Sequence, residues 1–271
     1  MLRAFLGVVV VGLCALTTSC AAQDFRVYTQ VWDLNAGDQP VSRSLTLWHA
    51  GKVYDVIHWA GEVTILEPAQ RRCSVLNTDK KLQTSVDDDE LKHMLDVAED
   101  RLSIRIQELD AKSNSSKDFL DNLRFQRHPQ FAKQFDPQQH RLALESRPLT
   151  YEVRVQEGVR PEAVEAYLNY ADWACRLNYV LHPQPVFPTA RLELNQQLRK
   201  LKLFPVEVKL RAQFDKPLSL RAVHTLSWNL DTTDREKIRR WESLLRDPKL
   251  QQVSLTEYQR AALNQVAAKV R

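Results

Sequence analysis

Residues 42–77 carry the pattern that most restricts the fold of this chain: four short runs with strand-like alternation, joined by three tight turns. The turns are marked by Ala50-Gly51, Ala60-Gly61 and Pro68-Ala69. Glycine accepts the positive φ that two-residue hairpin loops require, and proline suits the second position of a type I turn. Strands this short, with turns this short, can pair only antiparallel with their neighbours in the chain. The sequence therefore predicts an antiparallel meander with strands at 42–49, 52–59, 62–67 and 71–76.

Both faces of this meander carry apolar side chains. In the second strand, Val53 and Ile57 alternate with Tyr54 and Val56. A sheet with one solvent-exposed face shows a cleaner alternation of apolar and polar residues. Two interpretations stay open: a sheet packed between other layers, or a curved half-barrel around an apolar cavity.

The rest of the chain mixes strands and helices without a strand–helix–strand repeat, and no dinucleotide-binding fingerprint is present. Residues 127–139 are predicted to be irregular. Alternation predicts strands at 25–34, 141–145, 149–156, 206–214 and 218–228, and helical spacing predicts helices that begin near Ser85, Pro161, Thr189, Asp231 and Ser254. The expected fold class is α+β: a curved antiparallel sheet, half-barrel-like, covered by helices.

The first 22 residues predict a signal peptide. Arg3 supplies a positive start, and residues 4–16 form an apolar core too short to span a bilayer. Cys20-Ala21-Ala22 fits a small-x-small cleavage site. The alternative is lipidation at Cys20, because Ser19-Cys20 resembles the end of a bacterial lipobox, although Thr17 stands where leucine is usual.

Export follows from either form of processing. The expected mature chain, 23–271, is a single α+β domain with a sub-division near 112–139. We expect it in the periplasm or cell envelope, where only the signal peptide or a lipid on Cys20 would touch the membrane. In such a compartment Cys73 and Cys175 can form a disulfide, or both can remain buried thiols that behave as small apolar side chains.

Charge does not indicate a nucleic-acid partner. The chain has 38 basic and 34 acidic side chains, a formal net charge of +4, and Arg3 is the only charged residue of the signal-like segment. The excess is small and evenly spread, and no aromatic-rich basic motif accompanies it.

No catalytic or metal-binding motif stands out. The sequence lacks H-E-x-x-H and G-x-S-x-G, and no cysteine–histidine pattern matches a thiol protease. His49, His58 and Asp55 lie on predicted paired strands, but ordinary histidines are the better interpretation than a zinc site. The acidic run 87–90 favours a helix N-terminus over a calcium loop. We expect neither cofactor nor metal, and no enzymatic activity.

Several segments resemble known proteins. They are Trp48–Asp55 (WHAGKVYD), Gly61–Pro68 (GEVTILEP), Arg71–Asn77 (RRCSVLN), Ala171–Asn178 (ADWACRLN) and Pro188–Asn195 (PTARLELN). Together they resemble an uncharacterised family of exported bacterial proteins, with planctomycetes as the suggested source. Over about residues 25–110 the rhythm is similar, more distantly, to the periplasmic lipoprotein-carrier group. That resemblance implies a curved half-barrel closed by helices around an apolar cavity, and it supplies no catalytic residue.

Three functions remain as hypotheses. The first is an exported binding or carrier protein that holds an apolar group, such as the acyl chain of a lipid or lipoprotein, with the long helix after 85 as a lid. The second is a structural or interaction protein of the envelope with a filled core, and the third is a hydrolase whose site the sequence does not reveal. For the first, the candidate lining residues, chosen by their facing on the strands, are Trp48, Tyr54, Val56, Leu66 and Leu76.

Overall fold

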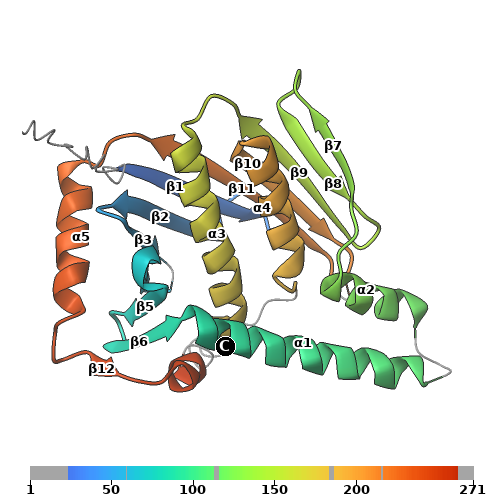
Figure 1. Ribbon diagram of the computed structural model, residues 1–271, viewed down its shortest axis with the longest axis horizontal. Coiled ribbons are helices and arrows are strands. Elements are labelled where there is room, and N and C mark those ends of the chain that lie inside the picture. Colours follow the sequence, from blue (N-terminus) through green and yellow to red (C-terminus); the bar gives the residue numbers. More distant parts are fainter. Residues whose placement is uncertain (1–23, 59, 113–115, 183–185, 215, 262–271) are drawn as a thin grey trace, which may run out of the picture.

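The computed structural model describes residues 24–58, 60–112, 116–182, 186–214 and 216–261 (Figure 1). The predicted signal peptide and Cys20 lie outside the described residues. None of the described helices is long and apolar enough to cross a membrane.

Strands and helices alternate in blocks along the described chain. The strands are β1 (Phe25–Asp33), β2 (Ser42–His49), β3 (Lys52–Ile57), β4 (Glu62–Glu67), β5 (Arg72–Asn77), β6 (Leu82–Asp87), β7 (Ala132–Asp136), β8 (Arg141–Glu145), β9 (Leu149–Gln156), β10 (Phe204–Ala212), β11 (Leu218–Ser227) and β12 (Gln251–Gln252). The helices are α1 (Asp88–Asp110), α2 (Lys117–Arg127), α3 (Pro161–Leu181), α4 (Thr189–Leu201) and α5 (Thr232–Leu244), with a 3₁₀ turn η1 (Pro68–Gln70). Residues 255–261 are also helical.

All of these strands belong to one open, curved sheet, with the order β12-β6-β5-β4-β3-β2-β1-β11-β10-β9-β8-β7. Every neighbouring pair is antiparallel except β12 and β6, which are parallel. The predicted fold class, an α+β fold with a curved antiparallel sheet covered by helices, is confirmed. The sheet is not closed, so it retains two edges, at β12 and at β7.

One face of the sheet is covered by α3 and α4, which cross it obliquely (Figure 1). The main hydrophobic core lies between these two helices and the sheet. It includes Trp48, Val53 and Leu66 from the meander together with Leu168 from α3 and Leu194 from α4. The two helices also pack against each other, and α1 contacts α2, α3 and β6.

On the opposite face, α5 packs over the meander. A second core there contains Leu47, Tyr54 and Ile65 from the sheet and Ile238 and Trp241 from α5. The rings of Tyr54 and Trp241 stack with centroids 6.3 Å apart. The apolar residues on both faces of the meander are thus explained by a helical layer on each side.

Two local predictions need correction. Ser85 does not cap the long helix, because β6 continues through it to Asp87, and the Asp87 carboxylate accepts the hydrogen bond from the Glu90 amide at 2.8 Å. The range 127–139 is not irregular throughout, since it contains β7, which pairs with β8. β7 is mostly exposed and therefore shows no apolar alternation.

The double layering predicts unequal costs for two isoleucine truncations. Ile65 is 0% exposed in the core under α5, so Ile65→Ala should lower the free energy of unfolding by about 2–5 kcal/mol. Ile104 on α1 is 56% exposed, and Ile104→Ala should change it by less than about 0.5 kcal/mol. Urea denaturation measures both, and equal losses would contradict the packing of α5 on the sheet.

Candidate functional site

A groove of about 1080 Å³ lies between α3 and the strands β2, β3 and β4. Its floor is made by Trp48, Val53 and Leu66, which are direct partners across neighbouring strands. The Phe25 ring stacks on the Trp48 ring with centroids 4.2 Å apart and an angle of 9° between the planes. These four side chains are buried, so they form a firm apolar base.

The wall of the groove is one face of α3. Ala163, Ala166, Tyr170 and Trp173 lie three or four residues apart and therefore project from the same side of the helix. The Trp48 indole N–H donates to the Ala166 carbonyl oxygen at 3.3 Å, which ties floor to wall. The small side chains at 163 and 166 leave the space that larger residues would fill.

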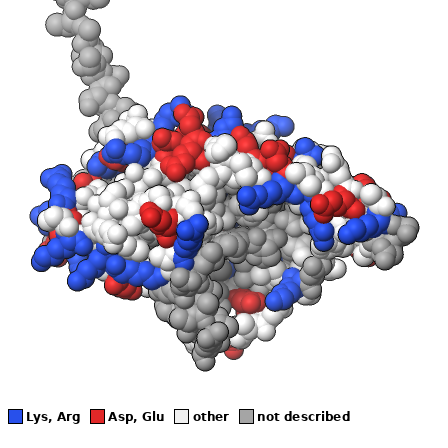
Figure 2. Space-filling model, turned by 90° about the horizontal axis from the view of Figure 1, so that it is seen from below, with Lys and Arg blue, Asp and Glu red and all other residues white. Residues whose placement is uncertain are grey.

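Charged groups stand around the mouth, and most of them form pairs. Arg71 pairs with Asp88, the first residue of α1, at 3.1 Å, and Lys52 pairs with Glu242 of α5 at 2.8 Å. The charges of the lower face of the molecule are also mixed in sign, around a broad hollow (Figure 2). The groove therefore offers an apolar interior within a rim of largely neutralised charge.

Asp55 lies in the sheet beneath the groove with its carboxylate buried. The Thr46 hydroxyl donates to Asp55 Oδ1 at 2.6 Å, and the Tyr170 hydroxyl also bonds to this carboxylate. Burial raises the pKa of Asp55 from 3.8 to about 6, against these two hydrogen bonds, which lower it. Burial and the nearby Asp55 charge raise the pKa of Tyr170 well above its usual value, so this groove-lining hydroxyl stays protonated.

The five residues predicted to line a cavity do not share one face. Trp48 and Leu66 line the groove. Tyr54, Val56 and Leu76 face the opposite side of the sheet, in the core under α5. The strand period of two places them there, because Tyr54 pairs with Leu47 and Ile65, whereas Val53 pairs with Trp48 and Leu66.

Sequence reasoning missed most of the groove wall. The sequence predicted a helix after Pro161 but assigned none of its faces to a site; Tyr167 and Leu168 of this helix are buried in the core. The pattern that marks the groove is the combination of two alanines with Tyr170 and Trp173 on a separate stripe of the same helix. Val53 and Phe25 were also missed, although their alternation with Tyr54 and Arg26 places them on the same face as Trp48.

The other candidate residues lie apart from one another. Cys73 and Cys175 are free thiols, the first buried and the second half-buried. His49 pairs with Asp24 at 2.9 Å, and His58 is exposed. Among the described residues, no group of three or more histidine, cysteine, aspartate or glutamate side chains is arranged to hold a metal ion.

Comparison with known proteins adds no family. No protein-family model matches the chain, and no curated protein matches it significantly. The function is therefore inferred from the groove and its surroundings.

The buried Asp55 carboxyl predicts a distinct pH dependence of stability. Its folded pKa of about 6 lies above the unfolded value of 3.8, so the folded state binds the proton more tightly and gains stability as pH falls below 6. The contribution is lost as pH rises from about 4 to 6, and two pKa units correspond to about 3 kcal/mol. Asp55→Asn lacks a proton to titrate, so its free energy of unfolding should gain on that of the parent chain by this amount across the interval.

Chemical denaturation at a series of pH values measures this difference. Asp38 is exposed, so Asp38→Asn is the matched control and should parallel the parent chain. A parallel course for Asp55→Asn as well would show that this carboxyl does not titrate in a buried setting.

Proposed function

We propose that the protein is an exported binding protein of the cell envelope that holds an apolar or lipid-type ligand in the groove beside α3. The observation that carries the proposal is the groove itself: about 1080 Å³, with an aromatic and aliphatic floor and a wall of alanine, tyrosine and tryptophan. Small-molecule sites typically have volumes of about 300–1,000 Å³ and predominantly apolar linings. The groove is therefore large enough for a ligand and has the chemistry of an apolar site.

The binding energy would come from removing apolar surface from water. Each buried methylene contributes about 0.8 kcal/mol, so the length of an acyl chain, more than any directional contact, would set its affinity. The floor is already packed against the core, so the chain would lie on Trp48, Val53 and Leu66 and against Trp173 of α3. Such a site selects apolar character and tolerates variation in the rest of the ligand.

The surroundings of the groove favour binding over catalysis. The rim ion pairs hold each other, as in Arg71–Asp88 and Lys52–Glu242, and Asp55 is covered by Thr46 and Tyr170. Among the described residues that line the groove there is no serine, threonine or cysteine, the hydroxyl and thiol nucleophiles that an adjacent base commonly activates. A carrier needs only a pocket that can be entered and left.

We do not propose the long helix α1 as a lid over the groove. Only the beginning of α1, at Asp88, reaches the rim of the groove, and the remainder runs along the lower edge of the molecule (Figure 1). Closure by the whole of α1 is therefore not part of the proposal.

The proposal predicts saturable binding of an apolar fluorescent probe. Trp173→Glu places a charge on the wall and should weaken binding at least tenfold, because an ionised carboxylate beside a buried acyl chain must be desolvated. Trp32→Glu makes the same replacement on the opposite face of the sheet, where Trp32 stacks beneath the Arg221 guanidinium at 5.2 Å, and should leave affinity unchanged. Fluorescence titration measures both. Absence of probe uptake by the parent chain would sink the carrier idea, and equal affinity of all three chains would place any bound probe elsewhere.

A further inference from the structure

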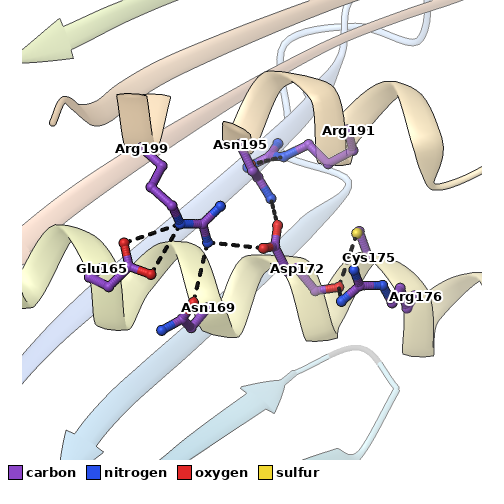
Figure 3. Close-up of polar contacts among 8 residues, drawn as sticks. All are labelled: Glu165, Asn169, Asp172, Cys175, Arg176, Arg191, Asn195 and Arg199. Carbon is purple, nitrogen blue, oxygen red and sulfur yellow. Dashed lines mark hydrogen bonds and ion pairs between the residues drawn. The ribbon is translucent and has the colours of Figure 1, made fainter. Parts of the chain in front are cut away.

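Arg191, in the first turn of α4, is a cation inside the fold with no carboxylate partner among the described residues. Its Nε atom donates to Asn195 Oδ1 at 3.0 Å (Figure 3). Its guanidinium also bonds to the Tyr167 hydroxyl. Among the described residues, Arg199 of α4 forms ion pairs with Glu165 and Asp172 of α3, whereas no ion pair includes Arg191. A guanidinium has five N–H donors, and no other bond from the described residues adds to these two, so the rest of the fork has no described partner.

Two acidic side chains of α3, Glu165 and Asp172, are already paired with Arg199 of α4. Its Nε atom lies 3.1 Å from Glu165, and one Nη atom lies 3.0 Å from Asp172. Asn195 stands between the two arginines: its amide nitrogen donates to Asp172 at 2.7 Å while its oxygen accepts from Arg191. Asn195 therefore separates Asp172 from Arg191, and the Asp172 carboxylate pairs with Arg199 (Figure 3).

The groups that do surround Arg191 are neutral. Burial raises the pKa of Cys175 to about 11 and that of Tyr151 to about 12, and it raises the pKa of Tyr167 as well. Burial, with the positive charge of Arg191, lowers the pKa of His224 to about 3, so the ring is uncharged at neutral pH. Within the described part of the chain, no carboxylate pairs with the guanidinium to balance its charge.

The hydrogen bonds around Tyr167 point the same way. Because the Tyr167 oxygen accepts a hydrogen bond from Arg191, the Tyr167 O–H group can donate to His224 Nε2, which lies 3.5 Å away. Nδ1 of that ring then carries the proton and donates to the Thr29 hydroxyl oxygen at 2.9 Å. The polar groups are thus satisfied along a chain from α4 through α3 to β11 and β1, and only the outer nitrogens of Arg191 remain.

Space accompanies the unpaired charge. Arg191, His224 and Cys175 lie deep among protein atoms, yet each keeps accessible surface. The apolar residues of the same sheet face nearby are also only partly buried, although α3 and α4 lie over them: Leu210, Leu220 and Ala222. Because these side chains lie deep in the fold and still have solvent-accessible surface, they must border a space between the packed elements that is large enough for water.

A buried charge requires a partner, because water no longer solvates it. The planar fork of arginine matches the oxygens of a carboxylate or phosphate in a bidentate arrangement. We propose that the internal space between α3, α4 and the strands β10 and β11 is an anion-binding site, in which Arg191 holds the carboxylate or phosphate group of a ligand beside the Tyr167 hydroxyl.

This site is separate from the apolar groove. Arg191, Tyr167 and Cys175 are not among the residues that line the groove, whose wall on α3 is formed by Ala163, Ala166, Tyr170 and Trp173. The anion site therefore stands or falls independently of the proposed function. Its ligand can be a small free oxyanion or the acidic head of a longer amphiphile.

Isothermal titration calorimetry on the full chain tests the site with three probes: inorganic phosphate, decanoate and the uncharged decanol. We expect the parent chain to bind phosphate, decanoate or both. A chain that binds decanoate should bind it at least tenfold more tightly than decanol. Arg191→Gln should lose at least tenfold in affinity for the anion that binds. Arg239→Gln, which removes the same charge from the exposed side of α5, should bind like the parent chain.

The outcomes separate the sources of the anion. Binding of phosphate that depends on Arg191 indicates a free oxyanion, and Arg191-dependent binding of decanoate alone indicates an amphiphile head group. Absence of anion binding by the parent chain, or equal losses in Arg191→Gln and Arg239→Gln, would overturn the proposal. If Arg191→Gln fails to fold, Arg191→Lys replaces it in the test. Lysine keeps the positive charge but lacks the planar guanidinium, so this variant should fold and still lose at least tenfold in affinity for the anion.

Discussion

The pairing of β1 with β11 holds the two halves of this protein together. Residues near the start of the described chain, from Arg26 to Asp33, match residues 220–227 one for one. β1 also pairs with β2, so the strand joins the N-terminal meander to the C-terminal strands in one sheet. Without it the meander and the β7–β11 block would be separate sheets, each with a further open edge.

Two salt bridges at the start of β1 fix the position of α5 relative to the sheet. Arg26 Nη1 lies 2.8 Å from Asp231 and 2.7 Å from Asp234, and these two residues form the capping box that begins the helix. The α5 layer over the meander is therefore placed by the strand at the centre of the sheet. The groove depends on this arrangement as well, because Phe25 of β1 supports the Trp48 ring of its floor.

The sequence predicted the parts of the fold that local chemistry determines. The glycine and proline turns placed the meander correctly. The helix start near Ser254 is confirmed, and there the Glu257 amide donates to Ser254 Oγ at 3.3 Å. β7 escaped prediction because an exposed edge strand needs no apolar alternation. The start of α1 was misplaced because Ser85 and Asp87 are both good helix caps, and only pairing with β5 shows that the strand extends to Asp87.

The site was less predictable than the fold, for a physical reason. Alternation separates Trp48 from Tyr54 as members of two faces, but both faces are apolar, and the helices that cover them come much later in the chain. Which face keeps a groove depends on where Ala163 and Ala166 meet the strands. Arg191 was not singled out at all, since its sequence neighbours do not show that the nearby acids belong to Arg199.

The two edges of the sheet are protected to different degrees. At β6 the edge is partly covered by the two-residue strand β12, with backbone bonds from Gln251 and Val253, and the following helical segment brings the Tyr258 hydroxyl to Glu62 at 3.0 Å. At β7 the outer edge is open and is guarded by exposed polar residues such as Lys133 and Gln134. An uncovered strand edge is a template for pairing with another chain. Residues 251–258 thus cover the β6 edge against pairing with another chain, and a protein cut before them by a protease would become prone to aggregation through β6, while the residues that line the groove would remain.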